Sequence, residues 1–199
     1  MSQHIPLTPG KYFHVYNRGN NGENIFLEKR NYTYFLKLYL KYIVPIADTF
    51  AYCLMPNHFH FLIQVHDVPN DYEFERWQSF VSLQYSTFFS TYTKSFNKAY
   101  ARHGSLFEKP FKRKLVAHSQ YFSNLVKYIH HNPQRHGFVD NFREWHWSSY
   151  SAMLSAQVTN IDKDAVIEWF GGEQEFVTSH GIEADSHQLA QLVEGDWFD

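Results

Sequence analysis

Large apolar side chains recur at helical spacing in three stretches of the chain, and each stretch predicts a helix. These are residues 28–44, 72–103 and 119–132, where apolar positions fall three or four residues apart. A proline or a glycine follows each stretch, as is typical of helix ends. In the third stretch, Ser119 suits the N-cap and Pro133 suits the end.

Four other stretches are rich in aromatic and branched residues, which predicts strands. They span residues 11–18, 49–55, 58–66 and 111–117. The second and third are separated only by Pro56-Asn57, which is turn chemistry. We therefore expect these two strands to form an antiparallel hairpin.

The predicted order is strand, helix, strand, strand, helix, strand, helix. This is the split βαβ order of a ferredoxin-like fold with one added helix. We predict an α+β protein in which residues 1–140 form a ferredoxin-like (RRM-like) antiparallel sheet with helices. Residues 141–199 contain short helical segments around 165–170 and 173–179, and we expect them to form an acidic helical C-terminal extension.

The composition is that of a globular protein. Of the 199 residues, 44% are hydrophobic and 19% are charged, which argues against wholesale disorder. No stretch approaches the ~20 apolar residues of a membrane span, and the N-terminus lacks the layout of a signal peptide. We therefore expect a cytoplasmic protein with no membrane partner. Because Cys53 is the single cysteine, a metal site would need His, Asn, Asp or Glu.

Charge is distributed unevenly along the chain. Residues 1–139 hold 16 Lys and Arg against 8 Asp and Glu, whereas residues 140–199 hold 2 against 12. A basic body with an acidic end is expected when one part meets phosphate and the other faces elsewhere, so this pattern favours a nucleic-acid partner. The acidic region would either restrain the site by competing with phosphate, or be a solvated tail without a role.

The segment MPNHFHFLI, residues 55–63, holds a candidate metal site. Side chains of a strand alternate between faces, so His58 and His60 share one face and the apolar residues share the other. Two imidazoles side by side can chelate one metal ion. A pair this short also occurs where histidines only form hydrogen bonds at a sheet surface, and the pair alone favours that interpretation.

The segment YFSNLVKYIHHNP, residues 121–133, holds a candidate nucleophile and a further candidate metal ligand. Tyr128 and Asn132 are four residues apart and project from one edge of the predicted helix. A tyrosine nucleophile beside an oxygen ligand for a histidine pair would suit metal-assisted phosphoryl transfer. The alternative is a partly buried tyrosine and an asparagine that caps the helix, and the segment alone favours it. The apolar stripe of this helix is Phe122, Leu125, Val126 and Ile129.

The combination of motifs is far more specific than either one. The segment MPNHFHFLI, followed about 70 residues later by YIHHNPQRHGFV and then by WHWSSY and EWFGG, resembles the REP-associated tyrosine transposases. These belong to the wider class of single-tyrosine HUH transposases. The resemblance covers nearly the whole chain, from YFHVYNRG to WFGG. The WSSY and WFGG extension separates this branch from the short insertion-sequence transposases, which usually lack it.

The resemblance implies a metal-dependent transposase and endonuclease that acts on single-stranded DNA. The family's histidine pair matches His58 and His60, its nucleophile matches Tyr128, and its third metal ligand matches Asn132. His131 is an alternative ligand, but its helical angle places it nearer the opposite side. The ligands would hold Mg²⁺ or Mn²⁺. The tyrosine would cleave and rejoin DNA near palindromic hairpins through a 5′-phosphotyrosine intermediate.

The partner that the resemblance implies is single-stranded or hairpin DNA, bound by a monomer or a homodimer. Basic side chains around the last strand and the third helix would position phosphates without reading sequence. Surface aromatics such as Tyr12 or Phe107 would stack unpaired bases, or would instead belong to the core. The expected phosphate contacts are Arg18, Lys109, Lys112, Arg113, Lys114 and Arg135.

Two other functions are compatible with the sequence. A ferredoxin-like sheet also binds RNA, so the chain is alternatively a domesticated, non-catalytic protein that binds hairpin DNA or RNA. The second alternative is a metal-dependent hydrolase that uses water in place of tyrosine as the nucleophile. The presence of both histidines, Tyr128 and Asn132 speaks against loss of activity.

Overall fold

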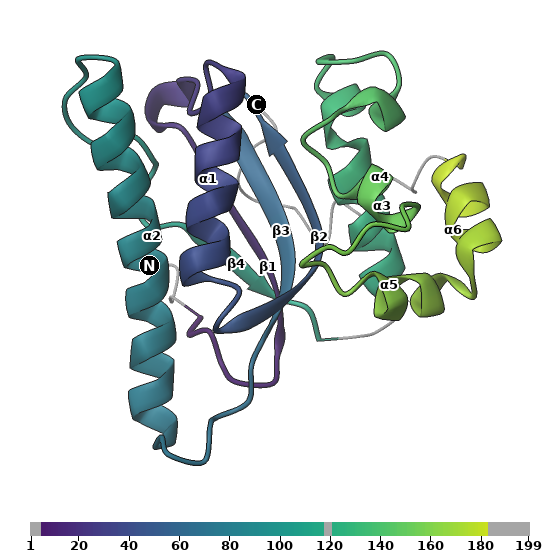
Figure 1. Ribbon diagram of the computed structural model, residues 1–199, viewed down its shortest axis with the longest axis horizontal. Helices are drawn as coiled ribbons and strands as arrows, with labels where there is room; N and C mark the ends of the chain where they lie inside the picture. The colour runs from purple at the N-terminus through teal and green to yellow at the C-terminus, as the bar shows by residue number, and fades with distance from the viewer. Residues whose placement is uncertain (1–4, 118–120, 183–199) are drawn as a thin grey trace.

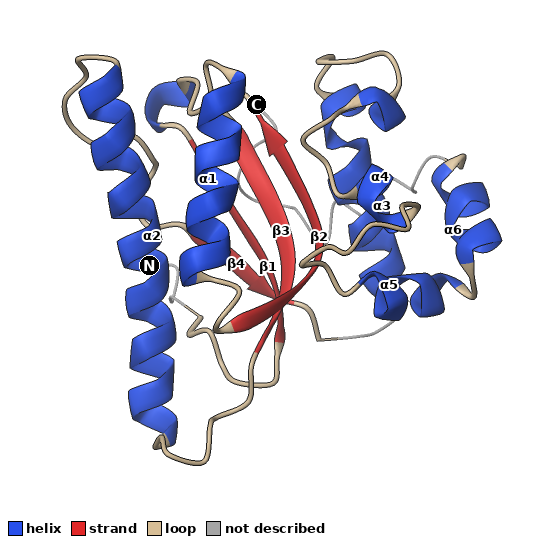
Figure 2. Ribbon diagram, in the orientation of Figure 1, coloured by secondary structure: helices blue, strands red, loops and turns tan. Residues whose placement is uncertain are grey.

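A four-stranded antiparallel sheet is the centre of the fold in the computed structural model, which describes residues 5–117 and 121–182. The strand order is β2-β3-β1-β4 (Figures 1 and 2). This order, with a helix after β1 and another after β3, is ferredoxin-like, so the predicted α+β fold is confirmed. The elements are β1 (Tyr12–Arg18), α1 (Lys29–Tyr42), β2 (Ala47–Met55), β3 (His58–Val65), α2 (Phe74–Ala99) and β4 (Lys112–Leu115).

Helices lie on both faces of this sheet (Figure 1). On one face, α1 and α2 enclose a core built largely of aromatic rings, among them Phe35 and Phe88. The predicted alternation in β3 supplies that core, because Phe59 and Phe61 point into it while His58 and His60 occupy the other face. The other face is covered by α3 (Phe122–Arg135), whose apolar stripe packs over β2 in a second core.

The third helix runs further than its sequence predicts. Pro133 lies inside α3, and the backbone turns away only where Gly137 adopts a φ of 70°. A proline costs a helix the hydrogen bond of its own missing N–H, and this close to the C-terminus one such loss leaves the last turn intact. The prediction that Pro133 ends the helix is therefore wrong. The predicted N-cap, Ser119, lies outside the described residues.

Short helices follow α3 and pack against its outer side (Figure 1). Asp162 caps α5 by accepting a hydrogen bond from the Ala165 amide, and Gly171, with a φ of 83°, ends it. These helices bury Val166 and Phe176 in the second core. The division of the chain at residue 140 stays a prediction. The elements are η3 (Phe142–Glu144), α4 (Tyr150–Met153), α5 (Lys163–Phe170) and α6 (Glu173–His180).

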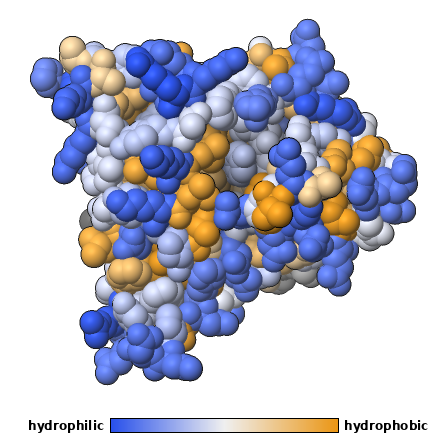
Figure 3. Space-filling model, viewed as in Figure 1, coloured by the Kyte–Doolittle hydropathy of each residue, from blue (hydrophilic) through white to orange (hydrophobic). Residues whose placement is uncertain are grey.

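The surface is mainly hydrophilic at the edges of the face shown in Figure 3, and hydrophobic residues gather near its middle and over the C-terminal helices. A shallow apolar depression, lined in part by Leu36 and Leu40, lies between α1 and β2. Among the helices that the structure describes, none has the length and apolar character needed to cross a membrane.

Candidate active site

The register of the central strands places the histidine pair among polar side chains from β1. His60 lies opposite Tyr16, and His58 lies opposite Arg18. Directly opposed residues of an antiparallel pair point to the same face, so all four side chains share the face that α3 covers. The imidazoles of His58 and His60 are 5.3 Å apart between ring centres.

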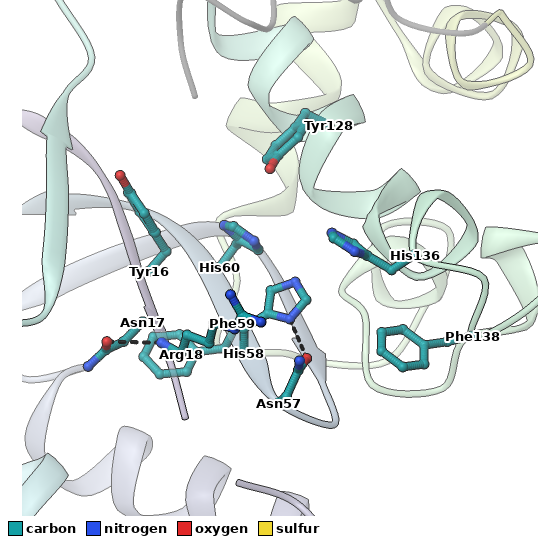
Figure 4. A pocket seen from close by; sticks show the side chains of 10 residues that line it. All are labelled: Tyr16, Asn17, Arg18, Asn57, His58, Phe59, His60, Tyr128, His136 and Phe138. Carbon is teal, nitrogen blue, oxygen red and sulfur yellow. Dashed lines mark hydrogen bonds between the residues drawn. The ribbon is translucent and has the colours of Figure 1, made fainter. Parts of the chain in front are cut away.

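Hydrogen bonds fix the orientation of both imidazoles. His58 Nδ1 donates to Asn57 Oδ1 at 2.7 Å (Figure 4), and His60 Nδ1 shares a 2.9 Å hydrogen bond with His14 Nε2. Both hydrogen bonds use the Nδ1 atoms and leave Nε2 as the other ring nitrogen of each imidazole. A ring nitrogen held in this way leaves the other nitrogen oriented as a metal ligand.

The three histidines on this face are neutral at neutral pH. Burial, with a smaller contribution from neighbouring basic groups, lowers the pKa of His58 and of His14 to about 3. Burial also holds the pKa of His60 well below its usual value. Metal ions bind the neutral imidazole, so this burial prepares the pair for a cation without competition from protons.

Helix α3 carries Tyr128 across this face and closes a cavity of about 320 Å³ (Figure 4). The ring of Tyr128 lies edge-on to His60, with 5.6 Å between ring centres. Burial raises the pKa of Tyr128, whereas Asn132 and the guanidinium of Arg135, 5.7 Å from the ring centre, act to lower it. The lining residues are Tyr16, Asn17, Arg18, Asn57, His58, Phe59, His60, Tyr128, His136 and Phe138.

Asn132 lies one helical turn beyond Tyr128 and is fully buried. Its Nδ2 donates to the Tyr128 carbonyl at 2.9 Å, whereas its Oδ1 has no hydrogen-bond partner of normal geometry among the described residues. The amide is nevertheless close enough to raise the pKa of His58 slightly against the effect of burial. A buried, unsatisfied amide oxygen near an imidazole pair is an arrangement that a cation would complete.

His131, the alternative ligand, is turned away from the cavity. Its Nε2 shares a hydrogen bond of 3.0 Å with the His180 carbonyl, and its ring stacks on Phe142. Of the two neighbours, Asn132 is thus the one on the side of the histidine pair. Among the described residues no group of three His, Cys, Asp or Glu side chains is placed to hold a metal ion. A site here would therefore use two imidazoles and an amide.

The expected phosphate contacts do not all lie on this face. Lys112 is opposite Tyr16 and Lys114 is opposite His14, which puts both lysines on the histidine face. Arg113, between them, belongs to the other face, where it donates to the Ile5 carbonyl and lies over Phe111. Arg113 therefore does not point toward the histidine pair, and its role as a phosphate contact stays a prediction. The alternation of side chains along the strand predicted at 111–117 already indicates that Arg113 points to the opposite face from Lys112 and Lys114.

The remaining expected contacts are Arg18, Arg135 and Lys109, of which Arg18 lines the active-site cavity. The guanidinium of Arg18 packs over Gly22. A Cβ atom at position 22 would lie 3.0 Å from a guanidinium nitrogen. Arg135 is exposed beside Tyr128, and Lys109 is exposed in the loop before β4. The two suggested base-stacking residues, Tyr12 and Phe107, pack against the second and the first core, respectively.

Sequence analysis missed His14 and His136 at the site. His14 precedes Tyr16 by two residues, the same spacing as in the histidine pair, but its contact with His60 depends on strand register. His136 lies past the expected helix end, 4.8 Å from His58 between ring centres. None of the described residues of the acidic region, 140–182, lines the cavity.

The fold and the site together define a class of α+β protein, one in which a histidine pair on the central strand of a ferredoxin-like sheet faces a tyrosine on a covering helix. Comparison with known proteins agrees with the motifs. The chain is 26% identical over 113 residues to a Haemophilus influenzae protein named as a REP-associated tyrosine transposase. The match covers 56% of this chain and 63% of that protein.

A solved structure gives the corresponding likeness in fold. The structure of a REP-associated tyrosine transposase bound to a REP hairpin matches with a TM-score of 0.53 at 16% identity. It covers 82% of this chain and 95% of the solved one. No protein-family model matches the chain. The resemblance to REP-associated tyrosine transposases that the motifs predict is thereby confirmed.

Proposed function

We propose that this protein is a metal-dependent transposase and endonuclease that cleaves and rejoins single-stranded DNA near hairpins. One observation carries the proposal: Tyr128, His58 and His60 line a single cavity beside the unsatisfied oxygen of Asn132. The related proteins support it, since one is named a REP-associated tyrosine transposase and another was solved with a REP hairpin.

In the proposed reaction, the Tyr128 oxygen forms a bond to the scissile phosphorus as the bond from phosphorus to the 3′-oxygen breaks. The phenol loses its proton and the departing 3′-oxygen gains one, which leaves a 5′-phosphotyrosine and a free 3′-hydroxyl. A second 3′-hydroxyl reverses these steps and releases the tyrosine. The phosphodiester bond energy is kept in the link, so rejoining needs no nucleotide triphosphate.

His58, His60 and Asn132 would hold the cation, which we propose is Mg²⁺ or Mn²⁺. When bound, a divalent ion polarises the phosphate and offsets the charge on its non-bridging oxygens. The chain's own groups perform the rest. Asn57 and His14 orient the two imidazoles, and Arg135 offsets the rise that burial causes in the pKa of Tyr128.

The proposal is tested by incubating the protein with labelled hairpin DNA, selected for binding from a pool with randomised single-stranded arms, and Mn²⁺. We expect a protein–DNA adduct that resists denaturation and maps to the peptide containing Tyr128. Tyr128→Phe should bind the hairpin and form no adduct, whereas Tyr121→Phe, a matched change about two helical turns earlier and outside the cavity lining, should react normally. His60→Ala should also abolish the adduct while phosphate contacts maintain hairpin binding.

Hairpin binding without an adduct in the wild-type protein would support the non-catalytic alternative. Metal-dependent cleavage that survives Tyr128→Phe would instead indicate a hydrolase that uses water. An adduct on any other tyrosine would overturn the assignment of the nucleophile.

A further inference from the structure

A second cavity, of about 710 Å³, lies between α2 and the loop at residues 104–111. Its apolar wall is made by the rings of Phe89, Phe107 and Phe111, and α2 adds serine and threonine hydroxyls. Asn17 lines both this cavity and the candidate active site. The two cavities are therefore neighbours with a common wall.

The backbone around this common wall is held by hydrogen bonds. Asn17 Nδ2 donates to the Glu108 carbonyl at 3.2 Å, and the Glu108 amide donates to the Arg18 carbonyl at 2.9 Å. The Asn20 amide donates to the Leu106 carbonyl at 2.9 Å. Because the loop is bonded to the end of β1, the second cavity keeps a fixed position relative to Arg18 and the histidine pair.

The cavity combines aromatic rings with positive charge. Phe89 is only partly buried, and its ring centre is 5.2 Å from that of Phe107 and 5.3 Å from that of Phe111. Lys94 and Lys109 also line the cavity, both are exposed, and neither forms a salt bridge with a described acidic residue. Two ammonium groups there face one carboxylate, that of Glu108.

We propose that this second cavity holds one unpaired nucleobase of the DNA strand that enters the active site. The base packs on the phenylalanine rings, and Lys94 and Lys109 contact the phosphates on either side of it. Every base has an aromatic face, and stacking on protein rings combined with a basic rim is a general mode of single-strand binding. The inference rests on the proposed function and adds to it a site that selects for an unpaired nucleotide next to the scissile phosphate.

The test uses the selected hairpin DNA with each unpaired position replaced, in turn, by an abasic nucleotide. For the wild-type protein we expect one position at which the loss of the base weakens binding about tenfold, which is typical of one stacked base. Ser90→Trp places a large side chain in the cavity from the exposed side of α2. In this variant the intact DNA should bind about tenfold more weakly, and the abasic change at that position should have no further effect.

Matched variants separate the cavity from its surroundings. Ser82→Trp, on an exposed position of the same helix outside the cavity, should keep the wild-type profile. Lys94→Ala combined with Lys109→Ala should reduce the salt dependence of binding by about two phosphate contacts. Lys98→Ala, an exposed lysine one turn further along α2, should leave it unchanged.

The outcomes distinguish this inference from the proposed function. If the wild-type protein forms the Tyr128 adduct but Ser90→Trp keeps the wild-type abasic profile, the second cavity does not hold a base and only this inference fails. The inference fails in the same way if the wild-type protein forms an adduct yet is insensitive to every abasic position. If the wild-type protein neither binds the hairpin nor forms an adduct, both fail.

Discussion

His14 is buried between the histidine pair and the basic edge of the sheet, and it holds His60 through one hydrogen bond. This hydrogen bond gives His14 an indirect role at the site, because His14 itself does not line the active-site cavity. Its Nδ1 atom is buried without a partner in the described part of the chain. A buried polar atom without a partner is unfavourable, so we expect His14 to have a function, which it performs by orienting His60.

We predict that His14→Phe weakens Mn²⁺ binding by about 10–100-fold, the usual effect of removing a hydrogen bond to a metal-ligating histidine. The phenyl ring keeps the packing against Tyr16, so the protein should remain folded. Calorimetric titration with Mn²⁺ measures the change, and circular dichroism checks the fold. Hairpin binding in the absence of metal should match the wild type. Equal Mn²⁺ affinity in the two proteins would show that His14 has only a packing role.

Arg135 is expected to set the pH at which Tyr128 reacts. Its cation favours the phenolate, so it lowers a pKa that burial raises. Arg135→Gln removes that effect, and the rate of adduct formation, measured at saturating DNA, should reach its plateau at a higher pH than in the wild type. Arg143→Gln, at an exposed arginine outside the cavity, serves as the control. A profile that does not move would exclude the electrostatic role.

The sequence reveals the site residues that are close in the chain and misses those that meet through the fold. His58 and His60 follow from strand alternation, and Tyr128 and Asn132 follow from helical spacing and the family resemblance. His14 joins them only because β1 pairs with β3 in one particular register. Alternation with Phe13 and Val15 predicts which face His14 shares with Tyr16, but no local pattern predicts which residues of β3 it meets.

Helix α3 is held between the sheet and the C-terminal helices. Its His130 shares hydrogen bonds with Ser149 Oγ at 2.7 Å and with His180 Nε2 at 2.9 Å, and His180 Nδ1 donates to the Phe176 carbonyl. These contacts lie two residues from Tyr128. The helices after residue 141 thus support the element that carries the nucleophile, which favours structural support over restraint of the site by acidic charge.

Phe176→Ala tests this support. Phe176 is fully buried and packs on Tyr150 and His180, so we expect the free energy of unfolding to fall by about 3–5 kcal/mol. Urea denaturation measures it. Leu83→Ala, at a side chain that is 58% exposed, should change the same quantity by less than about 0.5 kcal/mol. A small effect at Phe176 would mean that α6 is not part of the cooperative fold.

Element boundaries show where local signals suffice. The hairpin around Pro56-Asn57 forms as predicted because turn chemistry and alternation agree. At Pro133 the local signal fails, since α3 gains more from packing over β2 than it loses at one missing hydrogen bond. The sequence predicts the short helices around 165–170 and 173–179, but their packing beside α3 depends on contacts between residues far apart in the chain.

The whole molecule should lose stability in acid. His14 and His180 have pKa values of about 3 in the folded protein, against about 6.5 when unfolded, so below pH 6.5 the unfolded chain binds protons that the folded chain does not. Each such group should lower the free energy of unfolding by about 1.4 kcal/mol per pH unit. Urea denaturation between pH 7 and about pH 4 measures the slope. Constant stability over this range would contradict the burial of these groups.

The separation of the site's parts along the chain has a consequence for protein synthesis. The strands that bear Tyr16, His58 and His60 all lie within the first 65 residues, whereas Tyr128 and His136 come much later. The amino-terminal part of a chain leaves the ribosome first and is the first able to fold. A nascent chain therefore exposes its histidine pair long before its nucleophile emerges, so on the proposed mechanism it can capture a cation while still unable to cut DNA.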